Sequence, residues 1–143
     1  MPGMTVETEI AIAAPSEKVW AVLSDVERWH EWTASIKSVL LLDPKPLHEE
    51  SKALIEQPRL PKAVWEVTEL ERGRGFNWQA KSLGALTVGE HWITPNSKGG
   101  VKVALRVRQT GWLARVFRPW IEKLARAYVE MEAQGLKRRC EQA

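Results

Sequence analysis

The stretch WLARVFRPWIEKLARAYVEMEAQGLKRR, residues 112–139, decides the fold. Its apolar residues recur at steps of three and four, which places them on one stripe of a helix. This stripe consists of Leu113, Val116, Phe117, Trp120, Leu124, Ala127, Tyr128 and Met131. Pro119 stands inside the stripe, and a proline removes a backbone donor and clashes with the preceding turn. The pattern therefore predicts a short leading helix, a break near residues 115–118, and a main helix from Pro119 onward.

Most of the chain before this helix alternates between apolar and polar residues, as half-buried strands do. The expected strands cover residues 6–12, 35–43, 49–57, 63–71, 75–81, 85–94 and 101–108. Short turns separate the last six of them, so these strands must pair as antiparallel neighbours in a meander. A sheet with one apolar face needs a cover, and only the C-terminal helix is long enough to provide it.

Two short helices are expected between the first and second strands. Pro15 suits the first turn of a helix over residues 15–23. Ser24 and Glu27 match a capping box, which places a second helix over residues 25–32. Two helices in succession, without a strand between them, argue against a βαβ repeat. We therefore expect one α+β domain over residues 1–143.

The composition excludes several classes of protein. At 44% hydrophobic and 27% charged residues, the chain is typical of an ordinary globular domain. It has no apolar run near the ~20 residues that span a bilayer, and residues 1–4 lack the features of a signal peptide. Its single cysteine, Cys140, cannot form an intrachain disulfide, so we expect a cytoplasmic protein. A net charge of +3 is too small to indicate a nucleic-acid partner.

Tryptophan is the unusual component, with eight residues against one tyrosine and two phenylalanines. Large rings either fill a core or line a cavity, and the composition alone leaves both uses open. Motifs for other chemistry are missing from the sequence. His30, His48 and His91 are scattered without the spacing of metal ligands, so we expect no metal. The sequence has no Gly-x-Ser-x-Gly nucleophile elbow of the kind that hydrolases use, and we expect no cofactor.

Seven short strings occur in an order and at spacings that match a known superfamily: IAAPSEKVW (12–20), LSDV (23–26), WHEW (29–32), QPRLP (57–61), WEVTEL (65–70), FNW (76–78) and GLK (135–137). Through them the chain resembles the START-like, or SRPBCC, helix-grip superfamily, and within it the polyketide cyclase/dehydrase family of small bacterial proteins. The resemblance covers nearly the whole chain.

This resemblance implies a curved, seven-stranded antiparallel sheet wrapped around the long C-terminal helix, with two short helices after the first strand. It also implies a deep cavity between sheet and helix for an apolar or amphipathic small molecule. Members of the superfamily include lipid carriers, hormone receptors, plant allergens and aromatic-polyketide cyclases. Function must still be argued from the site, because one fold hosts many activities.

The cavity lining is expected on inward-facing strand positions and on the apolar stripe of the helix. The expected ligand-binding residues are Ile55, Trp65, Val67, Phe76, Trp78, His91, Val103, Leu105, Phe117, Trp120, Leu124 and Tyr128. Tyr128 is the single tyrosine, and its hydroxyl needs a hydrogen-bond partner once the ring is buried, either in the protein or on a ligand.

Two titratable residues, His91 and Glu69, are the candidates for proton transfer. His91 alternates with Trp92, and each shares its strand face with apolar residues, so alternation leaves open which of them points inward. An inward His91 could donate a hydrogen bond or carry a proton near neutral pH. Glu69 shares the expected inward face of Val67, and burial there would raise the pKa of its carboxyl group.

The leading hypothesis is binding or carriage of a hydrophobic small molecule, namely a lipid, an isoprenoid or a polyketide-like aromatic compound. One alternative is a cyclase or dehydratase that uses a pocket histidine or carboxylate, although the sequence holds no catalytic motif to decide it. Another is a protein-interaction module whose core is filled by its own side chains. Aromatic and basic residues at 112–120 predict at most a transient membrane contact, and we expect a monomer or a weak homodimer.

Overall fold

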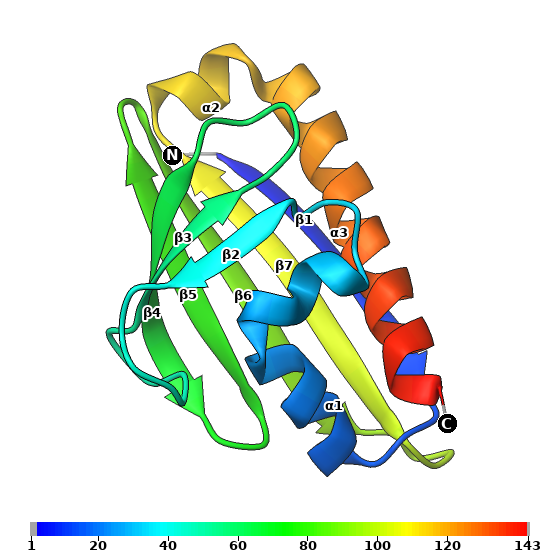
Figure 1. Cartoon of the computed structure of the whole chain (residues 1–143). Helices are drawn as coiled ribbons and strands as arrows, with labels where there is room; N and C mark the ends of the chain where they lie inside the picture. The colour runs from blue at the N-terminus through cyan, green and yellow to red at the C-terminus, as the bar shows by residue number, and fades with distance from the viewer. Residues whose placement is uncertain (1–2, 143) are drawn as a thin grey trace.

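The computed structural model describes residues 3–142, which form one antiparallel sheet with helices on its inner face (Figure 1). The strands are β1 (Met4–Ile12), β2 (Ser38–Leu41), β3 (Lys52–Glu56), β4 (Ala63–Glu71), β5 (Gly75–Ser82), β6 (Ala85–Pro95) and β7 (Val101–Thr110). The helices are α1 (Ser16–Ser24), the 3-10 helix η1 (Val26–Glu31), α2 (Trp112–Val116) and α3 (Arg118–Glu141).

The seven strands follow the order β1-β7-β6-β5-β4-β3-β2, so the six later strands form the predicted meander. β1 closes the other edge by pairing antiparallel with β7, from Met4 opposite Gln109 to Ile12 opposite Val101. The sheet curves around α3, which runs along β1 and β7 (Figure 1). The predicted helix-grip fold is thereby confirmed.

The break at Pro119 is also as predicted. α2 ends at Val116, and α3 begins at Arg118 with the proline in its first turn, where a missing N–H breaks no helical hydrogen bond. The backbone N–H of Phe117 donates to Leu113 at 3.1 Å, and that of Ile121 donates to Phe117 at 2.9 Å. The leading helix and the main helix are therefore separate pieces that meet at Phe117.

The predicted capping box was wrong. η1 has no side-chain cap, because Ser24 and Glu27 both bond elsewhere. The Ser24 hydroxyl donates to the Trp20 carbonyl at 2.7 Å, and the Glu27 carboxylate accepts the Leu41 backbone N–H at 2.9 Å. That bond is the main reason why the pKa of Glu27 is lowered. Glu27 thus links η1 to strand β2 rather than capping a helix.

One half of the inner face of the sheet is filled by these short helices. Trp29 on η1 is almost fully buried, and its indole N–H donates to the Leu23 carbonyl at 2.9 Å. Its ring lies 6.3 Å from that of Phe76, centroid to centroid. The packed core around these rings also includes Val19, Leu23, Val26, Val67, Ile93, Val103 and Leu105.

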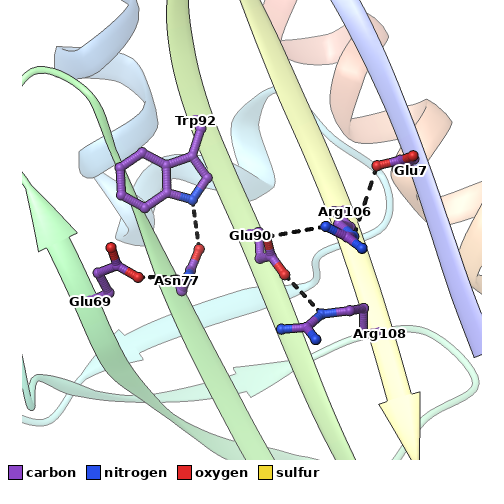
Figure 2. Close-up of polar contacts among 7 residues, drawn as sticks. All are labelled: Glu7, Glu69, Asn77, Glu90, Trp92, Arg106 and Arg108. Atoms are coloured by element: carbon purple, nitrogen blue, oxygen red, sulfur yellow. Dashed lines mark hydrogen bonds and ion pairs between the residues drawn. The ribbon is translucent and has the colours of Figure 1, made fainter. Parts of the chain in front are cut away.

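The outer face of the sheet is polar and needs no cover. Glu90 lies between Arg106 and Arg108 (Figure 2), and its carboxylate oxygens are 4.0 and 2.9 Å from the nearest guanidinium nitrogens of the two arginines. A carboxylate oxygen of Glu7 lies 3.8 Å from Nε of Arg106. Trp92 lies on this face as well, and its indole N–H donates to Asn77 at 2.7 Å. These contacts come from alternate positions of β1, β5, β6 and β7, so the residues between them point inward.

Candidate functional site

A cavity of about 610 Å³ lies between the sheet and α3, in the part of the inner face that α1 and η1 leave uncovered. Its strand wall includes Ile55, Ala63, Trp65, Trp78, Ala80, Ala85, Thr87, Gly89, His91, Val107 and Gln109. Its helix wall is formed by Trp120, Ile121, Leu124, Ala125, Tyr128, Val129 and Glu132 of α3. Trp29 and Ile36 also line it.

The cavity is hollow because inward positions at this end of the sheet carry small side chains. Ala80, Ala85 and Gly89 occupy positions of β5 and β6 that face inward. Gly89 pairs directly with Trp78, and a Cβ on Gly89 would lie 3.1 Å from the indole nitrogen. At the other end, the equivalent positions carry Phe76 and Ile93, whose bulk meets the short helices.

Seven of the twelve residues predicted to bind ligand line this cavity: Ile55, Trp65, Trp78, His91, Trp120, Leu124 and Tyr128. Four others, Val67, Phe76, Val103 and Leu105, point inward but belong to the packed core and not to the cavity wall. Alternation identifies the inner face of a strand, but it does not show how far along the strand the short helices reach. Phe117 is 50% exposed, at the junction of α2 and α3.

His91 points inward, toward the cavity. Its ring is buried, stacks on Phe76 at 4.5 Å and meets Trp29 edge-on at 5.3 Å. Burial lowers the pKa of His91 to about 4, so the ring is neutral at neutral pH. Nδ1 lies 3.2 Å from the Phe76 carbonyl oxygen, which can only accept, so Nδ1 carries the proton and Nε2 is left as an acceptor.

Glu69 does not lie in the cavity, which corrects the expected inward orientation. The register of β4 against β5 shifts between Val67 and Glu69, where Val67 pairs with Trp78 but Glu69 pairs with Asn77. This bulge inserts one residue and reverses the alternation beyond it. Glu69 is therefore exposed on the outer face, where its carboxylate accepts the Asn77 amide at 3.2 Å (Figure 2).

The acidic residue of the cavity is Glu132, which sequence reasoning missed. It follows Tyr128 by one helical turn, so the cavity-facing stripe of α3 continues through it. The Ser35 hydroxyl donates to its carboxylate at 3.3 Å. Burial raises the pKa of Glu132 to about 7, partly offset by this hydrogen bond. The sequence does carry one signal for it: Glu132 follows Tyr128 by four positions, which places both residues on the same face of the helix.

A small polar cluster holds Ser35 beneath Glu132. Thr33 and Ser35 are both buried, and their hydroxyl oxygens lie 2.7 Å apart. The side-chain amide of Gln57, which also lines the cavity, donates to the Ser35 carbonyl at 3.3 Å. The carboxylate of Glu132 therefore meets a positioned hydroxyl rather than a cation.

Tyr128 joins α3 to the loop between β3 and β4. Its hydroxyl donates to the carbonyl of Pro58, and burial raises the pKa of the phenol. That loop forms part of the cavity mouth, together with the β5–β6 turn, α2 and the start of α3. The mouth residues are Arg59, Leu60, Pro61, Lys62, Lys81, Ser82, Leu113 and Trp120.

Within residues 3–142 there is no group of three histidine, cysteine, aspartate or glutamate side chains placed to hold a metal ion. Across the same residues, no helix is long and apolar enough to cross a membrane.

The profile of the family described as "Polyketide cyclase / dehydrase and lipid transport" matches residues 4–141. The chain belongs to this family. No curated protein matches it. Its fold is the START-like fold, shared with a solved START superfamily protein.

Three solved structures illustrate the range of proteins that share the fold with this family member. A START superfamily protein from Mycobacterium smegmatis has a TM-score of 0.80 and 19% identity, and covers 97% of this chain and 98% of its own. Ginseng major latex-like protein 151 from Panax ginseng has a TM-score of 0.78 and 9% identity, covering 96% and 97%. The di-domain ARO/CYC StfQ from the steffimycin biosynthetic pathway has a TM-score of 0.79 and 12% identity, covering 96% of this chain and 50% of its own.

Proposed function

We propose that this protein binds and carries a hydrophobic small molecule in the cavity between the sheet and α3. The observation that carries the proposal is a cavity of about 610 Å³ with mostly apolar and aromatic walls and few polar groups. Ligand sites in proteins have volumes of roughly 300–1,000 Å³ and this kind of lining. Affinity would come from burying apolar ligand surface at about 25 cal/mol per Å², less the cost of ordering the complex.

The walls favour a ligand with rings or conjugated double bonds. Trp65, Trp78 and Trp120 each present an indole to the cavity, and Trp29 contributes to its inner end. Aromatic faces gain offset-stacked or edge-to-face contacts beyond simple burial. Such walls favour a polycyclic aromatic or isoprenoid compound over a saturated fatty acyl chain.

The mouth carries features suited to brief contact with a membrane during loading. Val116 and Phe117 are 62% and 50% exposed beside it, and Lys62 and Lys81 line its edge. Exposed apolar side chains flanked by basic ones bind the surface of anionic bilayers. Replacing Val116 and Phe117 together by serine should reduce cosedimentation with phosphatidylserine-containing vesicles. Met131→Ser, at an exposed position outside the cavity lining, is the matched control.

A second candidate function is proton-transfer catalysis on a bound polyketide-like substrate. Glu132, with a pKa of about 7, and neutral His91 both line the cavity, so an acid and a base are available near neutral pH. The cavity would fold a flexible chain into a reactive shape, and these groups would move protons. The remaining alternative, a protein-interaction module whose core is filled by its own side chains, is not supported by a cavity of this size.

Native mass spectrometry of the gently purified protein tests both candidates. A stoichiometric extra mass that is lost on denaturation supports binding and identifies the ligand class. Paired substrate and product masses would favour catalysis. A clean apo mass after incubation with polyaromatic, isoprenoid and fatty-acid panels would count against the cavity as a binding site.

A further inference from the structure

The charged residues of the cavity lining and His91 are divided between two regions of the cavity. Trp120, at the mouth, and Glu132 are twelve positions apart on α3, which is ~18 Å along a helix. Ala85 and His91 are six positions apart on β6, or ~20 Å along a strand. Tyr128, one helical turn before Glu132, bonds to the β3–β4 loop, and Thr87, between Ala85 and His91, accepts a hydrogen bond from Gln109 on the cavity wall. Glu132 and His91 lie well away from Trp120 and the β5–β6 turn. We call the region around these two residues the deep end.

Both titratable groups at the deep end can accept hydrogen bonds. His91 uses Nδ1–H toward the Phe76 carbonyl, so Nε2 retains its lone pair. Glu132 receives the Ser35 hydroxyl at 3.3 Å, and an ionised carboxylate has further acceptor sites on its two oxygens. The bound group that matches such a region is a hydrogen-bond donor.

The charged residues that line the cavity also favour a neutral hydrogen-bond donor over a carboxylate at the deep end. The cations among the cavity-lining residues are Arg59, Lys62 and Lys81, all on the β3–β4 loop or at the β5–β6 turn. A ligand carboxylate would be attracted to them at the mouth, and it would be repelled by Glu132 at the deep end. A fatty acid inserted head-first therefore meets the wrong charge, and one inserted tail-first places a methyl group against a carboxylate.

We propose that the deep end is a hydroxyl-binding subsite, so that the ligand is an apolar alcohol or phenol inserted with its O–H toward Glu132 and His91. The hydroxyl donates to the Glu132 carboxylate, with the neutral His91 ring beside it, while the apolar body lies against the indoles nearer the mouth. This inference rests on the proposed ligand-binding function and narrows its ligand class.

Calorimetric titration with 2-naphthol, naphthalene and 2-naphthoate tests the inference, because the three probes share one ring system. The titrations are made above pH 7, where Glu132 is ionised. We expect 2-naphthol to bind about tenfold more tightly than naphthalene, the effect of one charge-assisted hydrogen bond, and 2-naphthoate to bind most weakly. In Glu132→Leu the advantage of 2-naphthol over naphthalene should disappear while naphthalene still binds.

Glu130→Gln is the matched control, since Glu130 is exposed on the same helix and does not line the cavity. It should keep the preference for 2-naphthol, and Glu132→Gln, which retains an amide oxygen, should keep part of it. Circular dichroism checks that each variant is folded. Equal binding of 2-naphthol and naphthalene, or a preference that survives in Glu132→Leu, overturns the subsite but leaves the cavity proposal intact. Absence of binding by all three probes overturns both.

Discussion

Trp78 and Gly89 face each other across β5 and β6, and the indole nitrogen of Trp78 lies 3.1 Å from where a Cβ on Gly89 would stand. The pair keeps the cavity open, because a large ring rests against a position with no side chain. Gly89 has an ordinary backbone conformation, so a larger residue there is limited by space and not by strain.

Gly89→Val should therefore reduce ligand binding at least tenfold, since its methyl groups displace the Trp78 ring or occupy the cavity. Overpacking of this kind costs about 1–3 kcal/mol of stability. Thermal unfolding and naphthalene titration measure the two effects. Thr94→Val, on the exposed part of the same strand, should change neither. Unimpaired binding in a folded Gly89→Val protein would contradict the role of this pair.

Two alanines of α3 offer a matched test of the cavity itself. Ala125 lines the cavity, whereas Ala127, two residues later, is exposed. Ala125→Trp should fill much of the hollow and abolish uptake of a naphthalene-sized probe, while Ala127→Trp should bind like the wild type. Calorimetry reports binding and circular dichroism reports folding. Equal affinities for the two variants would show that ligand binds elsewhere.

Glu132 and His91 give the free energy of unfolding opposite dependences on pH. The pKa of Glu132 is about 7 in the folded protein and 4.5 ordinarily, so stability is lost as the pH rises between these values. The pKa of His91 is about 4 when folded and 6.5 ordinarily, so stability is lost as the pH falls through that range. Each slope is at most about 1.4 kcal/mol per pH unit, and the two offset each other between pH 4.5 and 6.5.

Single substitutions should separate these slopes. Between pH 4.5 and 6.5, Glu132→Gln should become more stable relative to the wild type as the pH rises, and His91→Gln should become less stable. Urea unfolding at the two ends of the range measures both changes. The exposed Glu130→Gln should run parallel to the wild type. Parallel curves for all four proteins would show that neither buried group has the shifted pKa.

Gly135 fixes the contact between α3 and the end of η1. A Cβ at this position would lie 1.9 Å from the Trp32 carbonyl oxygen, which is backbone and cannot rotate away. Gly135→Ala should thus destabilise the protein by about 2 kcal/mol or more, although alanine is the better helix former by about 1 kcal/mol. Chemical denaturation measures the loss. Gln134→Ala, at the exposed neighbouring position, should be neutral within about 0.5 kcal/mol.

The fold could be predicted because its signals are local and repeated. Alternation outlined the strands, the apolar stripe identified the C-terminal helix, and Pro119 marked its break. The errors arose where one contact overrides a pattern. The bulge after Val67 turned Glu69 outward, and Leu41 drew Glu27 away from a helix cap. Neither event leaves a periodic trace in the sequence.

The cavity was only half predictable for a different reason. Phe76 and Trp78 share one face of β5 and both pack in the core, yet only Trp78 also lines the cavity. The difference depends on where η1 ends above the sheet, which is a property of the tertiary arrangement. Glu132 was overlooked because an acidic residue interrupts an apolar stripe and so reads as the edge of the buried face.

The division of the inner face into a filled and a hollow half has a consequence for how such a chain can change over generations. Ala80 and Ala85 line the cavity, so substitutions there alter the shape offered to a small molecule without replacing a residue of the Trp29–Phe76 packing that holds the helices on the sheet. Selection can therefore retune specificity at one end of the same strands without endangering foldability at the other. The fold therefore places the residues that determine stability apart from those that determine ligand specificity, so the two properties can evolve separately.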